Sequence, residues 1–153
     1  MQPRLEYAKA SPEVAKAMIQ LESVVRRSGI DPRLLELIKI RASQINGCAY
    51  CIDMHTKDAR AKGETEQRIY ALNAWRETPF FSDKERAALA WTEAITNIQT
   101  GHAPDAVYGE LSRNFSEGEM VNLTLAITTI NAWNRIAIAF RSVPGSYQPT
   151  ASR

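Results

Sequence analysis

The sequence predicts an all-α protein of about six or seven helices, and three observations lead to this fold class. Helix-start signals recur along the chain, either as Ser or Asp followed by Pro, or as Ser with Glu three residues later. Gly, Asn or Pro follows most apolar segments at the point where a helix would end. No segment alternates apolar and polar residues over the length of a strand between turn residues, so nothing in the pattern favours a sheet.

Each expected helix has its own signal. Ser11-Pro12-Glu13 and Asp31-Pro32 each combine a cap residue with a first-turn proline, and Asn46-Gly47 is a strong terminator. Ser82-Asp83-Lys84-Glu85 and Ser116-Glu117-Gly118-Glu119 have the form of capping boxes. We expect helices over residues 12–27, 32–46, 48–62, 65–75, 83–98, 105–115 and 117–142.

Length and charge limit the classes of protein to which the chain can belong. A chain of 153 residues forms about one domain and buries about two-thirds of its unfolded surface, so it needs no disulfide or metal to fold. The 19 basic and 17 acidic residues are interspersed and give a net charge of +2, which argues against a nucleic-acid partner. The uncharged stretch from Met120 to Asn134 is broken by Thr and Asn residues and is too short for a membrane helix. The charged N-terminus does not resemble a signal peptide, so we expect a cytoplasmic protein with no membrane partner.

The chemically informative residues are the two cysteines, Cys48 and Cys51, and the nearby His55. In a helix that starts near Cys48, these residues stand at positions i, i+3 and i+7 and share one face. A helix N-terminus or a nearby base lowers the pKa of a thiol from about 8.5 towards neutrality, and the thiolate is the reactive form. A thiolate that attacks a peroxide becomes a sulfenic acid, which a second thiol converts to a disulfide. Two thiols and a base at a helix start are therefore sufficient for a redox cycle.

Other kinds of site that use paired cysteines fit the sequence less well. Two small core residues are the ordinary alternative, but the Asn46-Gly47 break, Tyr50 and His55 argue against it. A structural zinc site needs four ligands, and only the distant His102 could be the fourth. Covalent haem requires a His directly after the second cysteine, where Ile52 stands, and iron–sulfur clusters usually need four cysteines. We therefore expect no metal and no cofactor.

These residues resemble the central motif of the AhpD-type alkylhydroperoxidases of the carboxymuconolactone decarboxylase superfamily. The motif is Cys48-x-x-Cys51-x-x-x-His55 after a glycine, with Glu36 twelve residues before the first cysteine. The similarity covers about residues 13–141 and includes the segment Asn131-Ala132-Trp133-Asn134-Arg135. The resemblance implies one AhpD-like helical domain over residues 1–153 that forms a homo-oligomer, as a trimer or hexamer. We expect the tail, about residues 144–153, to be mobile.

The resemblance also implies a role for each residue of the motif. Cys51 would attack the peroxide, and Cys48 would resolve its sulfenic acid into a Cys48–Cys51 disulfide. His55 would accept the thiol proton, and Glu36 would polarise His55 through a water. The implied activity is an antioxidant thiol peroxidase that reduces hydrogen peroxide or organic hydroperoxides, with a separate dithiol reductant as its partner.

The residues around Glu36 allow two interpretations. Apolar neighbours on both sides let its helix bury Glu36 at least in part, and a buried carboxylate needs a partner such as a histidine. Alternatively, Glu36 is a solvated surface residue with Arg33, Lys39 and Arg41 close by. The spacing match to the family favours the first interpretation.

One departure from the family pattern concerns the proton relay. The best-studied members carry a second His between the cysteines, where this chain has Tyr50, so the relay could lose a member. A redox sensor without turnover, or a general dithiol oxidoreductase, is the alternative function. Lactone decarboxylation is a weaker alternative, because that branch of the superfamily generally lacks the paired cysteines.

The last predicted helix carries a polar stripe formed by Thr124, Thr128, Asn131 and Arg135, at positions i, i+4, i+7 and i+11. The stripe could line the reaction pocket or a subunit interface, or its members could bond to the backbone, and the sequence favours neither. We expect the three tryptophans to be packing residues and assign no role to His102.

Overall fold

The computed structural model of the chain describes residues 1–149, and all of their regular structure is helical. Eight α-helices and one 3₁₀-helix, η1, follow one another, with no β-strand in this part of the chain. Their bounds are α1 Tyr7–Ala10, α2 Pro12–Arg26, α3 Pro32–Asn46, α4 Ala49–Ala61, α5 Glu66–Ala71, η1 Leu72–Glu77, α6 Asp83–Thr96, α7 Asp105–Asn114 and α8 Glu117–Phe140. The predicted all-α fold class is confirmed.

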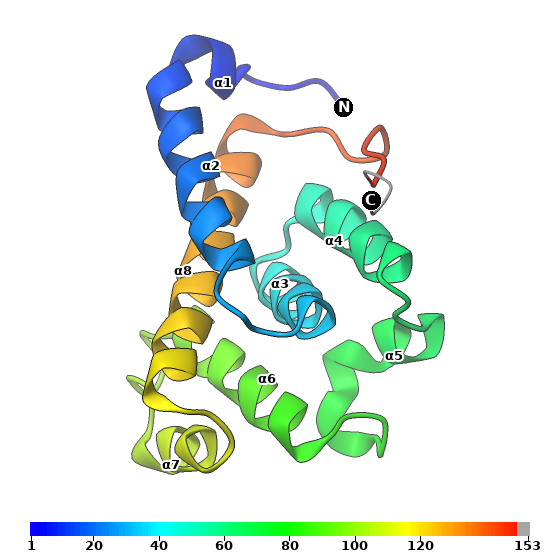
Figure 1. Ribbon diagram of the computed structural model, residues 1–153. Helices are drawn as coiled ribbons and strands as arrows, with labels where there is room; N and C mark the ends of the chain where they lie inside the picture. Colours follow the sequence, from blue (N-terminus) through cyan, green and yellow to red (C-terminus); the bar gives the residue numbers. More distant parts are fainter. Residues whose placement is uncertain (150–153) are drawn as a thin grey trace.

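Helix α3 lies at the centre of the fold, and α4, α6 and α8 pack around it (Figure 1). Nine of its 15 residues are buried, and three of these are the polar residues Glu36, Lys39 and Ser43. Buried polar groups need hydrogen-bond partners, so these side chains must find theirs on the surrounding helices. The partners of Glu36 and Ser43 belong to the candidate site.

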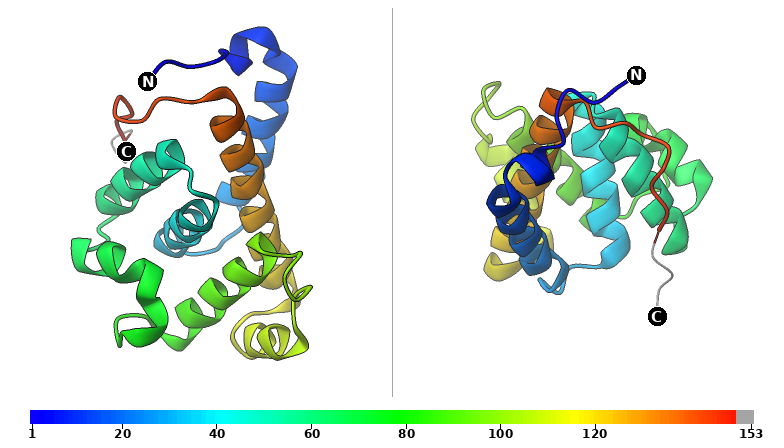
Figure 2. Two further views of the ribbon diagram at one scale, coloured as in Figure 1. Left: turned by 180° about the vertical axis from the view of Figure 1, so that it is seen from behind. Right: turned by 90° about the horizontal axis from the view of Figure 1, so that it is seen from above.

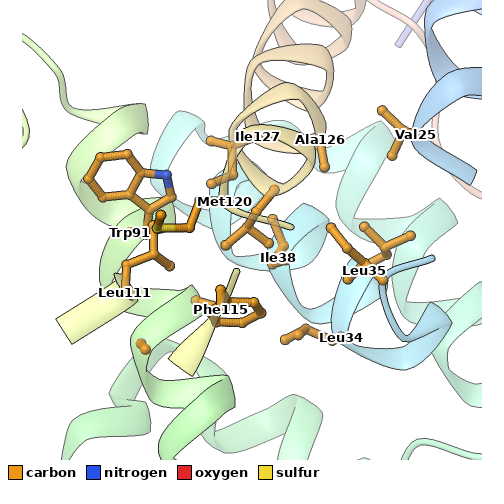
Figure 3. Close-up of a cluster of buried hydrophobic side chains, with 14 residues drawn as sticks. Val25, Leu34, Leu35, Ile38, Trp91, Leu111, Phe115, Met120, Ala126 and Ile127 are labelled. Atoms are coloured by element: carbon orange, nitrogen blue, oxygen red, sulfur yellow. The ribbon is translucent and has the colours of Figure 1, made fainter. Parts of the chain in front are cut away.

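The main hydrophobic core lies between α3 and the helices α2, α6, α7 and α8 (Figure 3). Ile38 of α3 belongs to one buried cluster with Trp91 of α6, Leu111 of α7 and Ile127 of α8. A second cluster joins Leu37 of α3 to α4, α5, η1 and α6. Each fully buried Leu or Ile side chain contributes about 1.5–3 kcal/mol, so these clusters hold α3 firmly in place.

The helix-start and helix-stop signals read from the sequence mostly act as predicted. Ser82 and Ser116 both form complete capping boxes, at the starts of α6 and α8. The Asp31 side chain accepts hydrogen bonds from two backbone N–H groups at the start of α3. Gly47 ends α3 in the left-handed conformation, with φ of 69°, which glycine adopts without steric cost.

Three local predictions differ from the structure. Ser11 makes no side-chain cap hydrogen bond, although α2 does begin at Pro12. The single helix predicted over residues 65–75 is divided into α5 and η1, with a non-helical Ala74 inside η1. The four-residue α1 was not predicted, because it has no cap and no acidic first turn.

After α8 the chain runs back across α4 (Figure 2). Lys57 of α4 donates to the carbonyl oxygens of Gly145 and Tyr147 at 3.3 and 3.1 Å. The mobility expected for residues 144–153 stays a prediction, and residues 150–153 lie outside the described part of the chain. Within residues 1–149, no helix combines the length and the apolar character needed to cross a membrane.

Candidate active site

The turn between α3 and α4 places the first cysteine. The Cys48 N–H donates to the carbonyl oxygen of Ser43 at 3.0 Å, one residue after the left-handed Gly47. Cys48 is therefore the N-cap residue of α4, and Cys51 lies in the first turn of that helix. The two thiols are in contact, with their Sγ atoms 2.7 Å apart.

The two thiols differ in acidity because the hydrogen bond between them favours ionisation of one and disfavours ionisation of the other. The hydrogen bond from the Cys51 thiol, helped by the backbone N–H groups of Cys51 and Tyr50 and by the Asn134 side chain, outweighs burial and lowers the pKa of Cys48 to about 7. The same thiol–thiol hydrogen bond, together with burial and the charge of Cys48, raises the pKa of Cys51. The reduced pair therefore loses its first proton near neutral pH, and the charge rests mainly on Cys48.

Cys51, in contrast, is the thiol that faces open space. A cavity of about 780 Å³ has Cys51, His55 and Glu36 in its wall. Cys48 is 1% exposed and does not belong to that wall. A molecule in the cavity would contact the sulfur of Cys51. Access therefore favours Cys51 as the reacting thiol, whereas acidity favours Cys48.

The second chemical feature of the site is a buried carboxylate that contacts a histidine and a lysine. The Glu36 Oε2 atom lies 2.8 Å from Nδ1 of His55, and Lys62 Nζ donates to Glu36 Oε1 at 2.7 Å. Burial opposes ionisation, but the hydrogen bonds and charges of His55, Lys39 and Lys62 outweigh it and lower the pKa of Glu36 to about 2. Glu36 is 5% exposed and contacts His55 directly, so the expectation of a water between them is not met.

The structure brings the four predicted site residues together as two pairs, Cys48 with Cys51 and Glu36 with His55. His55 lies one turn after Cys51 on α4, and the contact of its Nδ1 with Glu36 leaves Nε2 as the ring atom that can take up a proton. Within residues 1–149, His55 makes no hydrogen bond to either thiol. The two pairs meet at the cavity, which both Cys51 and His55 line.

Aromatic side chains form much of the cavity wall near Cys51. Tyr7 of α1 packs against Trp133 and Phe140 of α8, and Tyr7, Tyr50 and Trp133 all line the cavity. Burial raises the pKa of both tyrosines, so they stay protonated near neutral pH. Tyr50 can therefore donate a hydrogen bond but cannot replace the second histidine of the family as a base. Trp133 is a wall residue as well as a packing residue.

The segment after α8 supplies a further part of the wall, through Tyr147. Its hydroxyl donates to Asp58 Oδ1 at 2.8 Å. Burial and this hydrogen bond raise the pKa of Tyr147 to about 12.

Glu36, His55 and Asp58 offer ligand atoms that all lie within 4.8 Å of one another. Their neighbours make this a poor cation site, because Glu36 already binds the ammonium group of Lys62 and Asp58 accepts from Tyr147. The donor set is better suited to holding and moving a proton.

The polar stripe of α8 does not reach the cavity wall. All four of its side chains donate to backbone carbonyl oxygens of α8 itself, as one of the two open interpretations expected. The four donors are Thr124, Thr128, Asn131 and Arg135.

Two residues of the site, Lys62 and Asn134, were not found from the sequence. Lys62 stands before the glycine that follows α4 and reads as part of a helix end, yet its ammonium group binds Glu36. Asn134 is completely buried beside the thiols. Both contacts join segments that are far apart in the sequence, so no local pattern could indicate them.

Comparison with known proteins gives one family. The sequence profile of the Carboxymuconolactone decarboxylase family matches residues 12–94 of the chain. The uncharacterized protein YdfG of Bacillus subtilis is 50% identical over 139 residues, which are 91% of this chain and 95% of YdfG. Over 47 residues, 31% of this chain and 26% of the relative, the chain is 40% identical to the alkyl hydroperoxide reductase AhpD of Acidobacterium capsulatum.

A solved structure has the same fold over nearly the whole chain. It is ATU0492 of Agrobacterium tumefaciens, a protein of unknown function that has been suggested to be the antioxidant defence protein AhpD. ATU0492 is 48% identical and superposes with a TM-score of 0.90, covering 97% of this chain and 99% of that one.

Proposed function

Because the chain belongs to the carboxymuconolactone decarboxylase family and has an AhpD-like fold, we propose that it is a thiol-dependent peroxidase. It would reduce hydrogen peroxide or organic hydroperoxides through a dithiol/disulfide cycle of Cys48 and Cys51. One observation carries the proposal: Cys51 lies in the wall of a cavity, with a second thiol in contact with it and a Glu36–His55 pair one turn away.

In the first step, the thiolate of Cys51 attacks one peroxide oxygen and the O–O bond breaks. Cys51 becomes a sulfenic acid, and the other oxygen leaves as an alkoxide or hydroxide that takes up a proton. Nε2 of His55 would accept the thiol proton and return it to the leaving oxygen, while Glu36 holds the ring and stabilises its positive charge.

In the second step, the Cys48 thiolate attacks the sulfur of the Cys51 sulfenic acid. The S–O bond breaks, hydroxide leaves and is protonated to water, and a Cys48–Cys51 disulfide forms. A separate dithiol then reduces the disulfide by thiol–disulfide exchange and is itself oxidised.

The assignment of Cys51 as the attacking thiol rests on access to the cavity, although the charge of the reduced pair rests mainly on Cys48. Attack by Cys51 therefore requires the shared proton to move to Cys48 or to His55. With a pKa of about 7, Cys48 readily ionises again near neutral pH, which suits it to the second step.

The test is peroxide consumption measured by stopped flow, with a dithiol as the reductant. Cys51→Ser should reduce turnover to the uncatalysed rate, whereas Cys48→Ser should react once and accumulate a sulfenic acid that dimedone traps on Cys51. If the trapped sulfenic acid forms on Cys48 in the Cys51→Ser variant instead, the two roles are reversed. Mass spectrometry after one equivalent of hydroperoxide should find the Cys48–Cys51 disulfide in the parent.

The same experiment separates the alternative functions. A redox sensor would be oxidised once and would not consume further peroxide in the presence of the dithiol. A lactone decarboxylase would keep its activity after both cysteines are replaced, since that reaction does not need the thiols.

We also propose that the chain forms a single domain and a homo-oligomer. Exposed apolar side chains on two neighbouring helices support self-association: Val14 and Ile19 on α2, and Val121 and Ile138 on α8. Light scattering coupled to size-exclusion chromatography would give the number of chains, and a mass near 17.1 kDa would exclude the oligomer.

A further inference from the structure

A chain of three asparagine side chains runs from the backbone of α8 to the thiols. Asn46, the last residue of α3, donates from Nδ2 to Oδ1 of Asn131 and to Oδ1 of Asn134, both at 2.8 Å. Asn134 is fully buried and Asn131 is 8% exposed. Three amides in a buried position constrain one another, because each oxygen must face a donor.

The orientation of Asn131 is fixed by groups that cannot change their role. Its Nδ2 faces the carbonyl oxygen of Ile127 at 2.8 Å, and a carbonyl can only accept. Its Oδ1 faces the guanidinium of Arg135 at 3.1 Å, and a guanidinium can only donate. The amide of Asn131 therefore has only one orientation that satisfies both neighbours.

This orientation determines the next two amides. Because Oδ1 of Asn131 faces Asn46, Asn46 must present its NH2 group, which then also faces Asn134. The Asn134 amide must therefore present its acceptor atom, Oδ1, to Asn46, so its own NH2 group points away from Asn46. One hydrogen of this group is donated to Ser43 Oγ at 3.0 Å.

The second hydrogen of the Asn134 amide is not used by these bonds, and the amide lies beside Cys48 and Cys51. Helix α8 packs on the thiols through Ile130 and Ala137, and Asn134 stands between these two residues on the same helical face. We propose that the Asn134 amide is a fixed hydrogen-bond donor to the sulfurs of Cys48 and Cys51, held in this orientation by Asn46. This inference extends the peroxidase proposed above, because such a donor stabilises the thiolate on whichever sulfur carries it.

The effect on the thiols has a direction that can be measured. A hydrogen bond from Asn134 lowers the pKa of both cysteines. The titratable groups that face the thiols are Tyr7 from α1 and Tyr50 and His55 from α4, with Glu36 of α3 behind His55. The α8 residues that pack there, including Trp133, do not titrate; Ile130 and Ala137 help to bury the thiols, and Asn134 is the α8 residue that lowers their pKa.

The test is the pH dependence of thiol alkylation by iodoacetamide, with thiolate absorbance at 240 nm as a second measurement. Asn134→Leu keeps the branched shape of the side chain, although it is larger, and removes the donor. A lost hydrogen bond to a charged group should raise the midpoint by about one to two pKa units, a ten- to hundredfold slower alkylation below the midpoint. Asn46→Ala should give a smaller shift in the same direction, because the Asn134 amide is then free to turn over.

Thr129→Val is the matched control. Thr129 is a fully buried residue of α8 whose hydroxyl, within residues 1–149, bonds only to the Leu125 carbonyl at 2.7 Å, so its loss should leave the midpoint unchanged. If Asn134→Leu does not fold, the partly exposed Asn46→Ala decides the question. No shift in the folded variants, or an equal shift in Thr129→Val, would overturn the proposal. The alkylation experiment uses no peroxide. If the parent protein does not consume peroxide, the proposed peroxidase function is refuted, but the alkylation midpoints still test the role of Asn134.

Discussion

Glu36 and Glu93 are both carboxylates held between helices by positively charged groups, yet only one belongs to the candidate site. Glu36 of α3 contacts His55 and Lys62. Glu93 of α6 accepts hydrogen bonds from Arg41 at 2.8 Å and from the indole of Trp75 at 2.9 Å, and it pairs with Arg76. Burial raises the pKa of both carboxyl groups, but the hydrogen bonds and charges of their neighbours outweigh it and lower the pKa.

The difference lies in what the partners can do. The arginines and the indole around Glu93 keep their protons at all ordinary pH values, so the cluster can only hold α3, η1 and α6 together. The partner of Glu36 is a histidine, whose ring nitrogens can act as hydrogen-bond donor or acceptor, and it lines a cavity that also contains a thiol. A buried ion pair alone does not indicate a functional site. Glu36 differs from Glu93 in two respects: one of its partners is a histidine, and a cavity lies beside the pair.

The largest expected contrast is in turnover. Glu36→Gln should lower the rate of peroxide consumption by about 10²-fold, since a neutral amide neither orients His55 as firmly nor stabilises its protonated form. Glu93→Gln should consume peroxide at close to the parent rate. Equal rates in the two variants would remove the distinction between the clusters.

The order should be reversed for stability. Glu93→Ala leaves the Trp75 N–H and Arg41 without their acceptor and should cost about 2 kcal/mol, seen as a fall in Tm of about 4–8 °C. Glu36→Ala should cost less, because Lys62 is one-third exposed and can turn to solvent. Thermal unfolding of both variants at pH 7 measures this, and a larger loss for Glu36→Ala would contradict it.

The smallest effect concerns acid stability. The pKa of Glu36 is about 2 in the folded chain against an ordinary value of 4.5, so Glu36 contributes stability above pH 4.5 that is lost as the pH falls towards 2. Lys62→Met removes one of the groups that lower this pKa, so the loss should begin at a higher pH. The change should stay below about 1 kcal/mol, because Lys62 is partly solvated. Denaturant unfolding between pH 2 and 5 should show it, and superimposable parent and variant profiles would exclude the contribution of Lys62.

Most of the helical order follows from short-range signals. Some of these signals involve four or fewer consecutive residues and can therefore be recognised in the sequence. They are the capping boxes at Ser82 and Ser116 and the left-handed Gly47. Helix α1 had no such signal, because Tyr7 is held by ring contacts with Trp133 and Phe140 more than 120 positions away. Residues 65–75 are likewise divided at a place where long-range contacts are made, since the indole of Trp75, next to the non-helical Ala74, donates to Glu93 of α6.

The site was predictable where its members share a helix or a family motif. Cys48, Cys51 and His55 are separated by one or two turns of α4, and Glu36 was found through the spacing of the motif. Asn134 was not, because its role depends on the register between α8 and α3. The polar stripe on α8 pointed to Asn131, and the amide beside the sulfurs lies one turn later.

The spacing of the two cysteines has a consequence for the unfolded chain. A disulfide between Cys48 and Cys51 would close a loop of only four residues, which removes little freedom from the unfolded state and stabilises the fold by about 2 kcal/mol, against almost 5 for a loop of 100 residues. Oxidation and reduction would therefore change the free energy of unfolding by less than half of the change expected for a disulfide across a long loop. The equilibrium between dithiol and disulfide then depends mainly on the local geometry of the two cysteines and on the reductant, and less on the stability of the rest of the fold.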